Sequence, residues 1–381
     1  MRAVLVELEL RADELDAAFG SPGAPGRATR LPLDSVYLGG GTPSLLAAAD
    51  VAALLERIER RFGIAADAEV TIEANPGPDE RGDLAGFRAA GVTRISFGAQ
   101  SLDVGELKRL GRRHRPVDVL DAVEAARRAG IEHRSVDLLY DIPGQTVATW
   151  QRSVERVLEA PIDHLSAYAL TLDDPDAAGL VGPTGDHLPV RPGARRWRRT
   201  VAAEQHEDRA ADQYLWLDER LGAAGFHWYE ISNWARQGGA SRHNQAYWRR
   251  LPTLGLGPGA HGFDGGRRRT WNAARLDAYL AALLPHEASA GHPGLTPRLP
   301  PGGGELLDDE AIRLETVSLA MRTDNGVGVG LLPSAAAPAV DAAVQAGLLE
   351  FAEAPGVPST RLRLTAPGRL LAAELAVRLA E

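Results

Sequence analysis

The sequence predicts an α/β protein: a partial parallel (β/α)6 barrel of TIM-like type, followed by a small C-terminal α+β domain. From residue 35 to residue 231, short apolar segments alternate with longer amphipathic ones, as in successive strand–helix units. Polar and glycine residues gather where the predicted strands end, which in a parallel barrel is the face that binds ligands. No strand is predicted before residue 35, so we expect the barrel to lack its first strand.

The predicted elements follow one another in a regular order. Residues 1–19 place apolar and acidic residues at helical spacing, which predicts an amphipathic helix that ends in a Gly/Pro/Ser stretch, 20–34. Strands are predicted at 35–38, 68–73, 93–98, 133–140, 162–169 and 226–231. Helices are predicted at 43–62, 79–90, 103–111, 116–129, 146–159 and 204–224. The segment 173–196, rich in Asp, Gly and Pro, is predicted to be irregular.

The last third of the chain is predicted to contain a second domain. Residues 232–269 are rich in glycine and predicted to be irregular, and a helix is predicted at 273–284. After it come two helical patterns and a strand candidate, Arg361 to Leu364, which indicate a winged-helix-like fold. We therefore expect four parts: a helix and linker (1–34), the barrel with its extension (35–284), a Pro/Gly linker (285–304) and a C-terminal domain (305–381).

Composition excludes several classes of function. The net charge is −9 and no basic block is present, which gives no case for nucleic acid as a partner. No apolar run reaches membrane-spanning length, and residues 1–19 lack the basic-then-apolar order of a signal peptide. We therefore expect a cytoplasmic protein without a membrane span, which leaves room for peripheral contact with a membrane-bound recipient. The sequence contains no cysteine, so its own residues provide no disulfide and no thiolate-bound cluster.

The polar residues at the predicted strand ends are the candidate ligand site. The residues that we expect to converge there are Gly39, Gly40, Gly41, Thr42, Glu73, Gln100 and Asp137. A carboxylate inside an apolar strand is costly unless it is paired, so Glu73 and Asp137 favour a ligand or partner. Structural alternatives remain open. The glycines could form a tight turn with Thr42 as the helix N-cap, and Asp137 could pair with an arginine.

Several ordered motifs resemble one known family. Five of them are similar to the radical SAM barrel of oxygen-independent coproporphyrinogen III oxidases: Tyr37-Leu-Gly-Gly-Gly-Thr-Pro-Ser-Leu45, Glu73-Ala-Asn-Pro76, Ser96-Phe-Gly-Ala-Gln-Ser101, Leu110-Gly-Arg-Arg-His114 and Val136-Asp-Leu-Leu-Tyr-Asp-Ile-Pro-Gly-Gln-Thr146. Three more resemble the heme-chaperone branch of that family: Tyr229-Glu-Ile-Ser-Asn-Trp-Ala235, Ser241-Arg-His-Asn-Gln-Ala-Tyr-Trp248 and Leu254-Gly-Leu-Gly-Pro-Gly-Ala-His-Gly262. The resemblance covers about residues 35–172 and 205–285, and more weakly the C-terminal domain.

The resemblance implies cofactors, partners and site residues. It implies that S-adenosyl-L-methionine (SAM) binds at Gly39, Gly40, Gly41, Thr42, Glu73, Gln100, Arg112 and Asp137. It implies heme and a heme-accepting protein as partners, with His243 as the ligand to the heme iron and with Tyr247 and Trp248 on the porphyrin face. His261 is the rival ligand. Without the resemblance, His243 is better interpreted as a structural hydrogen-bonding residue near Asn244.

The chain departs from the family's pattern at one decisive place. The family holds a 4Fe-4S cluster on three cysteines spaced Cys-x-x-x-Cys-x-x-Cys, and this sequence has none. Residues 1–19 resemble the helix that follows that cluster loop. We expect either a misassigned start, which we favour, or a natural truncation that works without a cluster. Because SAM cleavage needs the cluster's electron, we expect no reductive SAM cleavage by this chain.

Two functions from different classes are therefore carried forward. The first is a heme-binding chaperone-like protein on a radical SAM scaffold, which delivers heme to a partner. The alternative is an enzyme, the oxygen-independent coproporphyrinogen III oxidase of porphyrin biosynthesis. The motifs between residues 229 and 262 and the missing cysteines argue against the enzyme.

Overall fold

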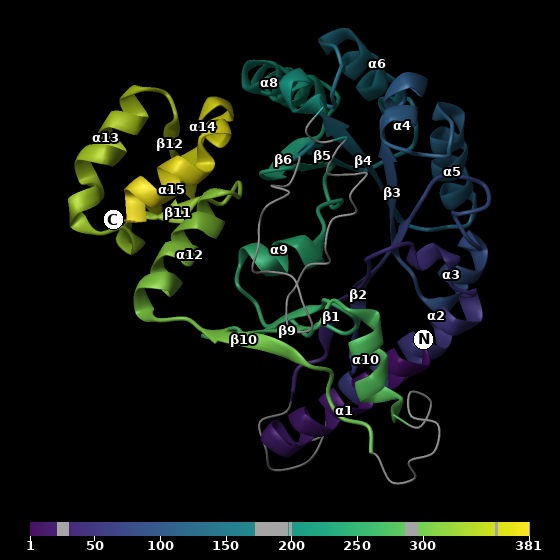
Figure 1. Ribbon diagram of the computed structural model, residues 1–381. Helices are drawn as coiled ribbons and strands as arrows, with labels where there is room; N and C mark the ends of the chain where they lie inside the picture. The colour runs from purple at the N-terminus through teal and green to yellow at the C-terminus, as the bar shows by residue number, and fades with distance from the viewer. Residues whose placement is uncertain (21–29, 172–196, 198–199, 286–295, 355–356, 381) are drawn as a thin grey trace.

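A computed structural model describes residues 1–20, 30–171, 197, 200–285, 296–354 and 357–380. Its centre is a curved seven-stranded sheet in the order β1-β2-β3-β4-β5-β7-β6, in which β1 to β5 run parallel (Figure 1). The strands of this sheet are β1 (Leu33–Leu38), β2 (Ile64–Ala74), β3 (Arg94–Gln100), β4 (His133–Tyr140), β5 (His164–Ala169), β6 (His227–Glu230) and β7 (Asn233–Ala235). The predicted α/β class and partial parallel barrel are confirmed.

Helices cover the outer face of this sheet, because one side of each strand is apolar. Ile72, Ile95, Phe97, Val136 and Leu165 are fully buried between the strands and the helices. The helices around the sheet are α2 (Ala48–Phe62), α3 (Leu84–Ala90), α4 (Val104–Arg109), α5 (Pro116–Arg128), α6 (Val147–Leu158) and α8 (Glu207–Ala223). The predicted helix at 43–62 is divided into a 3-10 turn, Pro43–Leu45, and α2. Residues 173–196 lie outside the described part of the chain.

The end of the sheet differs from the predicted run of parallel strands. We expected 226–231 to pair beside the fifth strand, but β7 lies between β5 and β6 and is antiparallel to both. Only Ile231 and Ser232 separate β6 from β7, so the two strands form a tight hairpin. With only three residues, β7 is too short to show a strand pattern, and its residues fell in the segment predicted to be irregular.

The predicted N-terminal helix is present as α1 (Arg2–Phe19), and β1 lies at the sheet edge as expected. Glu7 fixes α1 to a distant part of the chain, although its side chain is fully buried. Its carboxylate accepts hydrogen bonds from Gly257 N (2.9 Å), Asn272 Nδ2 (2.7 Å) and Tyr279 Oη (2.6 Å). This fully satisfied carboxylate holds α1 against the segment that follows the barrel.

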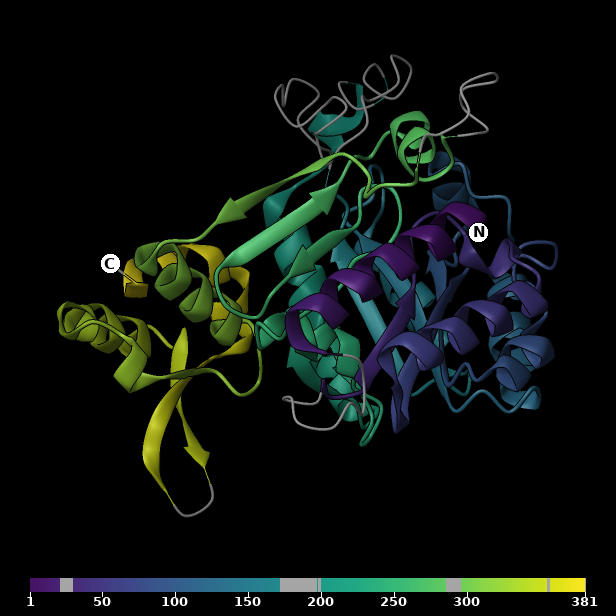
Figure 2. The ribbon, with the colours of Figure 1, turned by 90° about the horizontal axis from the view of Figure 1, so that it is seen from below.

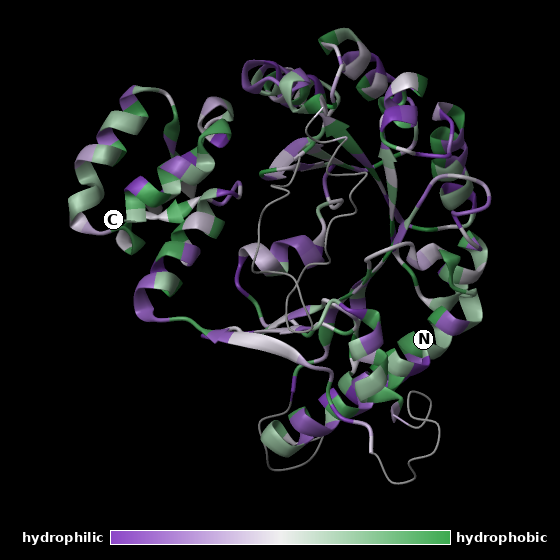
Figure 3. Ribbon diagram, viewed as in Figure 1, coloured by the Kyte–Doolittle hydropathy of each residue, from purple (hydrophilic) through white to green (hydrophobic). Residues whose placement is uncertain are grey.

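The glycine-rich extension is more ordered than predicted. It contains α9 (Arg242–Trp248), β8 (His261–Phe263) and β9 (Arg268–Asn272), and α10 (Leu276–Leu283) follows. β10 (Gly302–Leu306) pairs with β9 in an antiparallel sheet, so residues 302–304 of the predicted linker are strand. Figures 1 and 3 show α9, a largely hydrophilic helix, in the hollow of the curved sheet instead of on its outer surface.

The C-terminal part has its own apolar core, which includes Val317, Met321, Val327, Leu362 and Leu379. Its helices are α12 (Asp309–Met321), α13 (Ala337–Gln345), α14 (Ala366–Leu370) and α15 (Ala372–Ala380). A small antiparallel sheet joins them, in the order β11 (Val327–Gly328), β13 (Val357–Leu364), β12 (Leu349–Ala354). Figure 2 shows this part as a separate lobe beside the barrel.

An ion pair between Arg369 of α14 and Asp218 of α8 connects this lobe to the barrel. Both terminal nitrogens of Arg369 donate to Asp218 on α8, at 2.8 and 2.6 Å, and the guanidinium lies 4.3 Å from the Trp228 ring centroid.

Among the described residues, no helix is both long and apolar enough to cross a membrane.

Candidate functional site

The inner face of the curved sheet is polar. Every second residue of β2 to β5 points away from the outer helices and toward the hollow that holds α9. A cavity of about 190 Å³ opens between this face, β1 and α9. It is lined by Tyr37, Thr71, Glu73, Arg94, Ser96, Ser135, Asp137, His164, Ser166, Tyr168, Ser241 and Asn244. The interior of an ordinary TIM barrel is filled by packed apolar side chains. The lining of this cavity is mostly polar, which suits a polar ligand.

Glu73, in the cavity lining, is held by two hydrogen bonds. Its Oε1 accepts a hydrogen bond from Tyr37 Oη at 2.7 Å, and its Oε2 accepts one from Gly40 N at 3.1 Å. Burial and the neighbouring Glu73 raise the pKa of Tyr37, so its hydroxyl keeps the proton that it donates. Gly40 and Gly41 have φ angles of 81° and 70°, which favour glycine.

Asp137 lies deeper, in β4. Its carboxylate accepts hydrogen bonds from Ser96 Oγ at 2.9 and 3.0 Å and from Ser135 Oγ at 3.4 Å. Burial raises its pKa to about 6, and hydrogen bonds from Ser166 and Ser96 limit that rise. No described arginine pairs with Asp137, so the structural alternative of an arginine partner does not apply among the described residues.

A second group of predicted residues meets at Asn75. Arg112 Nη1 donates to Asn75 Oδ1 at 3.3 Å, and Asn75 Nδ2 donates to Thr42 Oγ1 at 3.5 Å. Thr42 is the N-cap residue of the Pro43–Leu45 turn, but its side chain makes no capping bond. Gln100 has a φ angle of 67°, an uncommon backbone conformation for a residue other than glycine. Burial lowers the pKa of Arg112.

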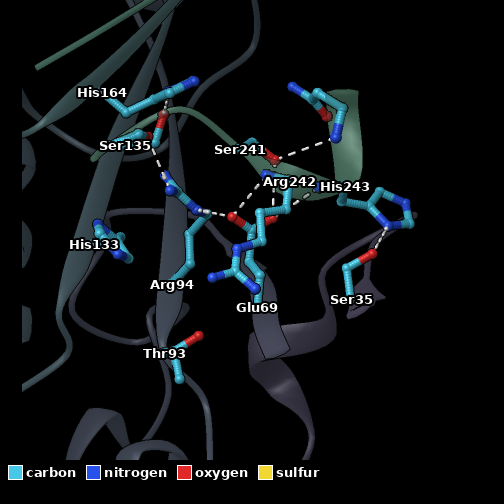
Figure 4. Close-up of polar contacts among 12 residues, drawn as sticks. Ser35, Glu69, Thr93, Arg94, His133, Ser135, His164, Ser241, Arg242 and His243 are labelled. Atoms are coloured by element: carbon cyan, nitrogen blue, oxygen red, sulfur yellow. Dashed lines mark hydrogen bonds and ion pairs between the residues drawn. The ribbon is translucent and has the colours of Figure 1, made fainter. Parts of the chain in front are cut away.

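His243 lies on the first turn of α9, beside Tyr37 of the cavity lining (Figure 4). Its Nδ1 lies 3.0 Å from Ser35 Oγ, and its Nε2 lies 3.3 Å from Tyr247 Oη. The ring stacks on Tyr37, with 4.8 Å between centroids and 22° between planes. Burial lowers the pKa of His243, so the imidazole is neutral at pH 7 and keeps a lone pair for a metal.

The other residues predicted around His243 lie on or near α9. Tyr247 is 52% exposed, and Trp248 is half-buried. Of the neighbouring arginines, Arg242 pairs with Asp67 at 3.0 Å and Arg250 with Glu315 at 3.3 Å. The rival ligand, His261, is exposed on β8 and stacks on Trp271 with 6.1 Å between centroids.

Sequence reasoning missed the residues that hold α9 in place. Glu69 of β2 accepts hydrogen bonds from Arg242 N (3.0 Å), His243 N (3.1 Å) and Ser241 Oγ (2.9 Å). Arg94 donates to Glu69 at 2.8 Å and to Gly239 O at 2.8 Å. Figure 4 shows these side chains converging under α9. The available signal was the same as for Glu73, a charged residue inside an otherwise apolar strand.

A second chain of contacts connects Asp137 with α9. His164 Nδ1 lies 2.7 Å from Ser135 Oγ, and His164 Nε2 lies 2.7 Å from Tyr229 Oη. Tyr229 Oη in turn accepts a hydrogen bond from Ser241 N at 3.4 Å. Burial lowers the pKa of His164 to about 3, so this buried imidazole stays neutral at pH 7.

Comparison with known proteins identifies the family. Residues 26–157 match the Radical SAM superfamily. The chain is 38% identical over 370 residues to the heme chaperone HemW of Mycobacterium tuberculosis H37Rv, a match that covers 97% of this chain and 83% of the relative. It is 36% identical over 310 residues to HemW of Synechocystis, covering 80% and 68% of the two chains.

The chain belongs to the HemW family. The resemblance to the heme-chaperone branch is thereby confirmed. The structure is also similar to that of the coproporphyrinogen III oxidase HemN from Escherichia coli, with a TM-score of 0.72 over 99% of this chain and 82% of that one. The two are 20% identical, so this likeness supports the shared fold and does not extend HemN's activity to a HemW relative.

Proposed function

We propose that this protein binds heme on α9 and passes it to an acceptor protein. The observation that carries the proposal is the HemW relationship over nearly the whole chain, since the relatives are named heme chaperones. The geometry supplies a candidate ligand in His243. A neutral histidine is a common axial ligand to heme iron, and this one lies beside an exposed tyrosine on a polar helix.

The contacts of His243 suggest which nitrogen would face the iron. If Nδ1 carries the proton, it donates to Ser35 Oγ, and the lone pair of Nε2 points to the Tyr247 side. Such a hydrogen bond on the other ring nitrogen commonly fixes the tautomer of a metal-bound histidine. Tyr247 then has to give up only a long, 3.3 Å contact when the iron approaches. Arg249, whose guanidinium donates to the neutral Gln245 at 2.7 Å, is the better placed cation for a propionate.

The residues also fit SAM, which would bring a positively charged sulfonium and an ammonium group. Glu73 and Asp137 supply two carboxylates in one cavity, and Gly40 N donates to Glu73 beside it. Thr42, Gln100 and Arg112 would complete the site around Asn75. When bound, SAM supplies an adenosyl group next to these residues.

The residues do not fit an iron–sulfur cluster. The sequence has no cysteine, and the described residues contain no group of three or more His, Asp or Glu side chains that could hold a metal. The alternative function, oxidation of coproporphyrinogen, depends on that cluster. We therefore favour heme carriage over radical chemistry for this chain, with the cytoplasm as its predicted location.

Heme transfer tests the proposed function. The 381-residue protein is loaded with one equivalent of heme, separated from free heme, and mixed with the apo form of a heme protein that has a distinct Soret band. We expect transfer faster than from a His243→Ala preparation or from heme alone in buffer. A protein that keeps no heme through the separation, or that never releases it, would contradict the proposal.

A further inference from the structure

We propose that Tyr37 is a positioning residue that couples occupancy of the Glu73 cavity to heme binding at His243. This inference rests on the proposed function. Tyr37 contacts both places: its hydroxyl donates to Glu73 and its ring stacks on His243. Neither contact was expected from the sequence, because an aromatic residue in a strand is more commonly part of the core.

Both partners of Tyr37 are fixed from their far sides. Glu73 is held through its second oxygen by Gly40 N at 3.1 Å. His243 is held through Nδ1 by Ser35, two residues before Tyr37 on the same strand, at 3.0 Å. The edge of the His243 ring meets Tyr247 at 89°. The Tyr37 ring therefore has little freedom to turn without moving one of the two groups.

Gly39 gives independent support for this arrangement. A Cβ atom at position 39 would lie 2.7 Å from Tyr37 Cε1 and 3.1 Å from Glu73 Oε1. Both distances are shorter than normal contacts, whereas the same addition at Gly40 or Gly41 meets nothing within 4 Å. The backbone at 39 does not need the left-handed conformation, so we infer that glycine is required there because Tyr37 and Glu73 pack against it.

The sign of the coupling follows from the hydrogen-bonding capacity of Glu73. Each carboxylate oxygen can accept two hydrogen bonds, and each accepts one in this structure. A cationic ligand that donates to Glu73 therefore adds a contact without displacing Tyr37. The bound ligand restrains Glu73, and Glu73 restrains Tyr37 through their hydrogen bond. Because Tyr37 stacks on His243, the imidazole ring is then held in the orientation that its contact with Ser35 favours. By linkage, heme binding then tightens the binding of that ligand by the same factor.

Paired titrations test the coupling. Heme is titrated into the 381-residue protein with and without saturating SAM, and SAM binding is measured separately by calorimetry. We expect SAM to tighten heme binding about fivefold, at the lower end of common coupling factors. In Tyr37→Phe, which keeps the ring and removes the hydroxyl, both ligands should still bind and the factor should fall to about one.

Two further variants complete the design. Tyr140→Phe is the matched control, because the Tyr140 ring packs against Trp150 and Tyr214 on the outer side of the sheet, and it should keep the full factor. Gly39→Ala should lose the coupling like Tyr37→Phe, without removal of any polar group. Circular dichroism confirms that each variant is folded.

The outcomes separate two kinds of failure. Heme binding that depends on His243 but is the same with and without SAM overturns the coupling and leaves the proposed function standing. The same is concluded if SAM does not bind, or if Tyr37→Phe keeps the full factor. Heme binding that is unaffected by His243→Ala overturns the proposed function itself, and the coupling with it.

Discussion

Burial of the Asp137 carboxylate costs free energy, and the same burial places a negative charge inside the cavity. Its carboxylate lies in a strand whose neighbours Val136 and Leu138 are fully buried, and hydroxyls of Ser96 and Ser135 solvate it in place of water. Burial still dominates and raises its pKa to about 6. At pH 7 most molecules therefore carry an ionised Asp137, and the negative charge is lost as the pH falls through 6.

This pKa predicts a pH dependence for SAM binding. SAM is cationic at its sulfonium, so we expect it to bind the ionised form of Asp137 preferentially. Between pH 7 and pH 5 the ionised fraction falls about tenfold, and the association constant should fall by about the same factor. Calorimetry of the wild-type protein and of Asp137→Asn checks this expectation. The variant should bind weakly and show little pH dependence in this window, and an equally strong dependence in both proteins would contradict the assignment.

At the scale of elements, α9 is a short helix inside a barrel, and it depends on two side chains from the sheet. Glu69 accepts hydrogen bonds from the first backbone N–H groups of α9, which a seven-residue helix leaves without internal partners. Arg94 neutralises Glu69, and both side chains are almost fully buried, at 3% and 5% exposed. Burial alone would raise the pKa of Glu69, but Arg94 and the hydrogen bonds outweigh it and lower that pKa.

Removal of the Glu69 carboxylate, which anchors α9 to β2, should lower the free energy of unfolding strongly. Glu69→Ala leaves the Arg94 guanidinium buried and unpaired, a loss that commonly costs about 3 to 5 kcal/mol. We expect a decrease of that size in the free energy of unfolding, measured by urea denaturation, together with weaker heme binding. The matched control is Asp67→Ala, which breaks the exposed pair with Arg242 on the same helix and should cost less than about 1 kcal/mol. Equal effects of the two changes would refute the anchor.

Elements that have a local hydrophobic pattern could be predicted from the sequence. Elements that depend on contacts between residues far apart in the chain could not. The five parallel strands and their helices could be predicted, because apolar periodicity follows from burial on one face. β7 and α9 could not, since three and seven residues are too few for a pattern and α9 depends on Glu69, more than 170 residues away. Glu73 and Asp137 were recognisable as carboxylates in apolar strands. Tyr37 was not, because only the fold brings it to His243.

At the scale of the whole molecule, the barrel holds a polar cavity lined by two carboxylates, and the sequence contains no cysteine. The cavity residues and α9 form one continuous polar interior, closed from outside by apolar helix packing. The C-terminal lobe contacts the β6 edge through the bridge between Glu230 and Thr323.

The absence of cysteine from these 381 residues leads to a prediction about cluster assembly. After anaerobic reconstitution with iron and sulfide, the 381-residue protein should show no cluster absorbance. Incubation with SAM and a strong reductant should then yield no 5′-deoxyadenosine above a no-protein blank. Deoxyadenosine formed in proportion to protein concentration would show that other ligands hold a cluster.

The most direct test of the account is a heme titration of the wild-type protein, His243→Ala and His261→Ala, followed at the Soret band. His261 is the matched control, because it is also a histidine beside an aromatic ring, but on exposed β8 outside the barrel hollow. We predict a saturable Soret shift at one equivalent for the wild type and for His261→Ala. His243→Ala should lose the shift or bind at least about tenfold more weakly, which corresponds to about 1.4 kcal/mol. If His243→Ala binds heme as the wild type does, the central claim is wrong, and if His261→Ala alone loses the shift, the ligand is His261.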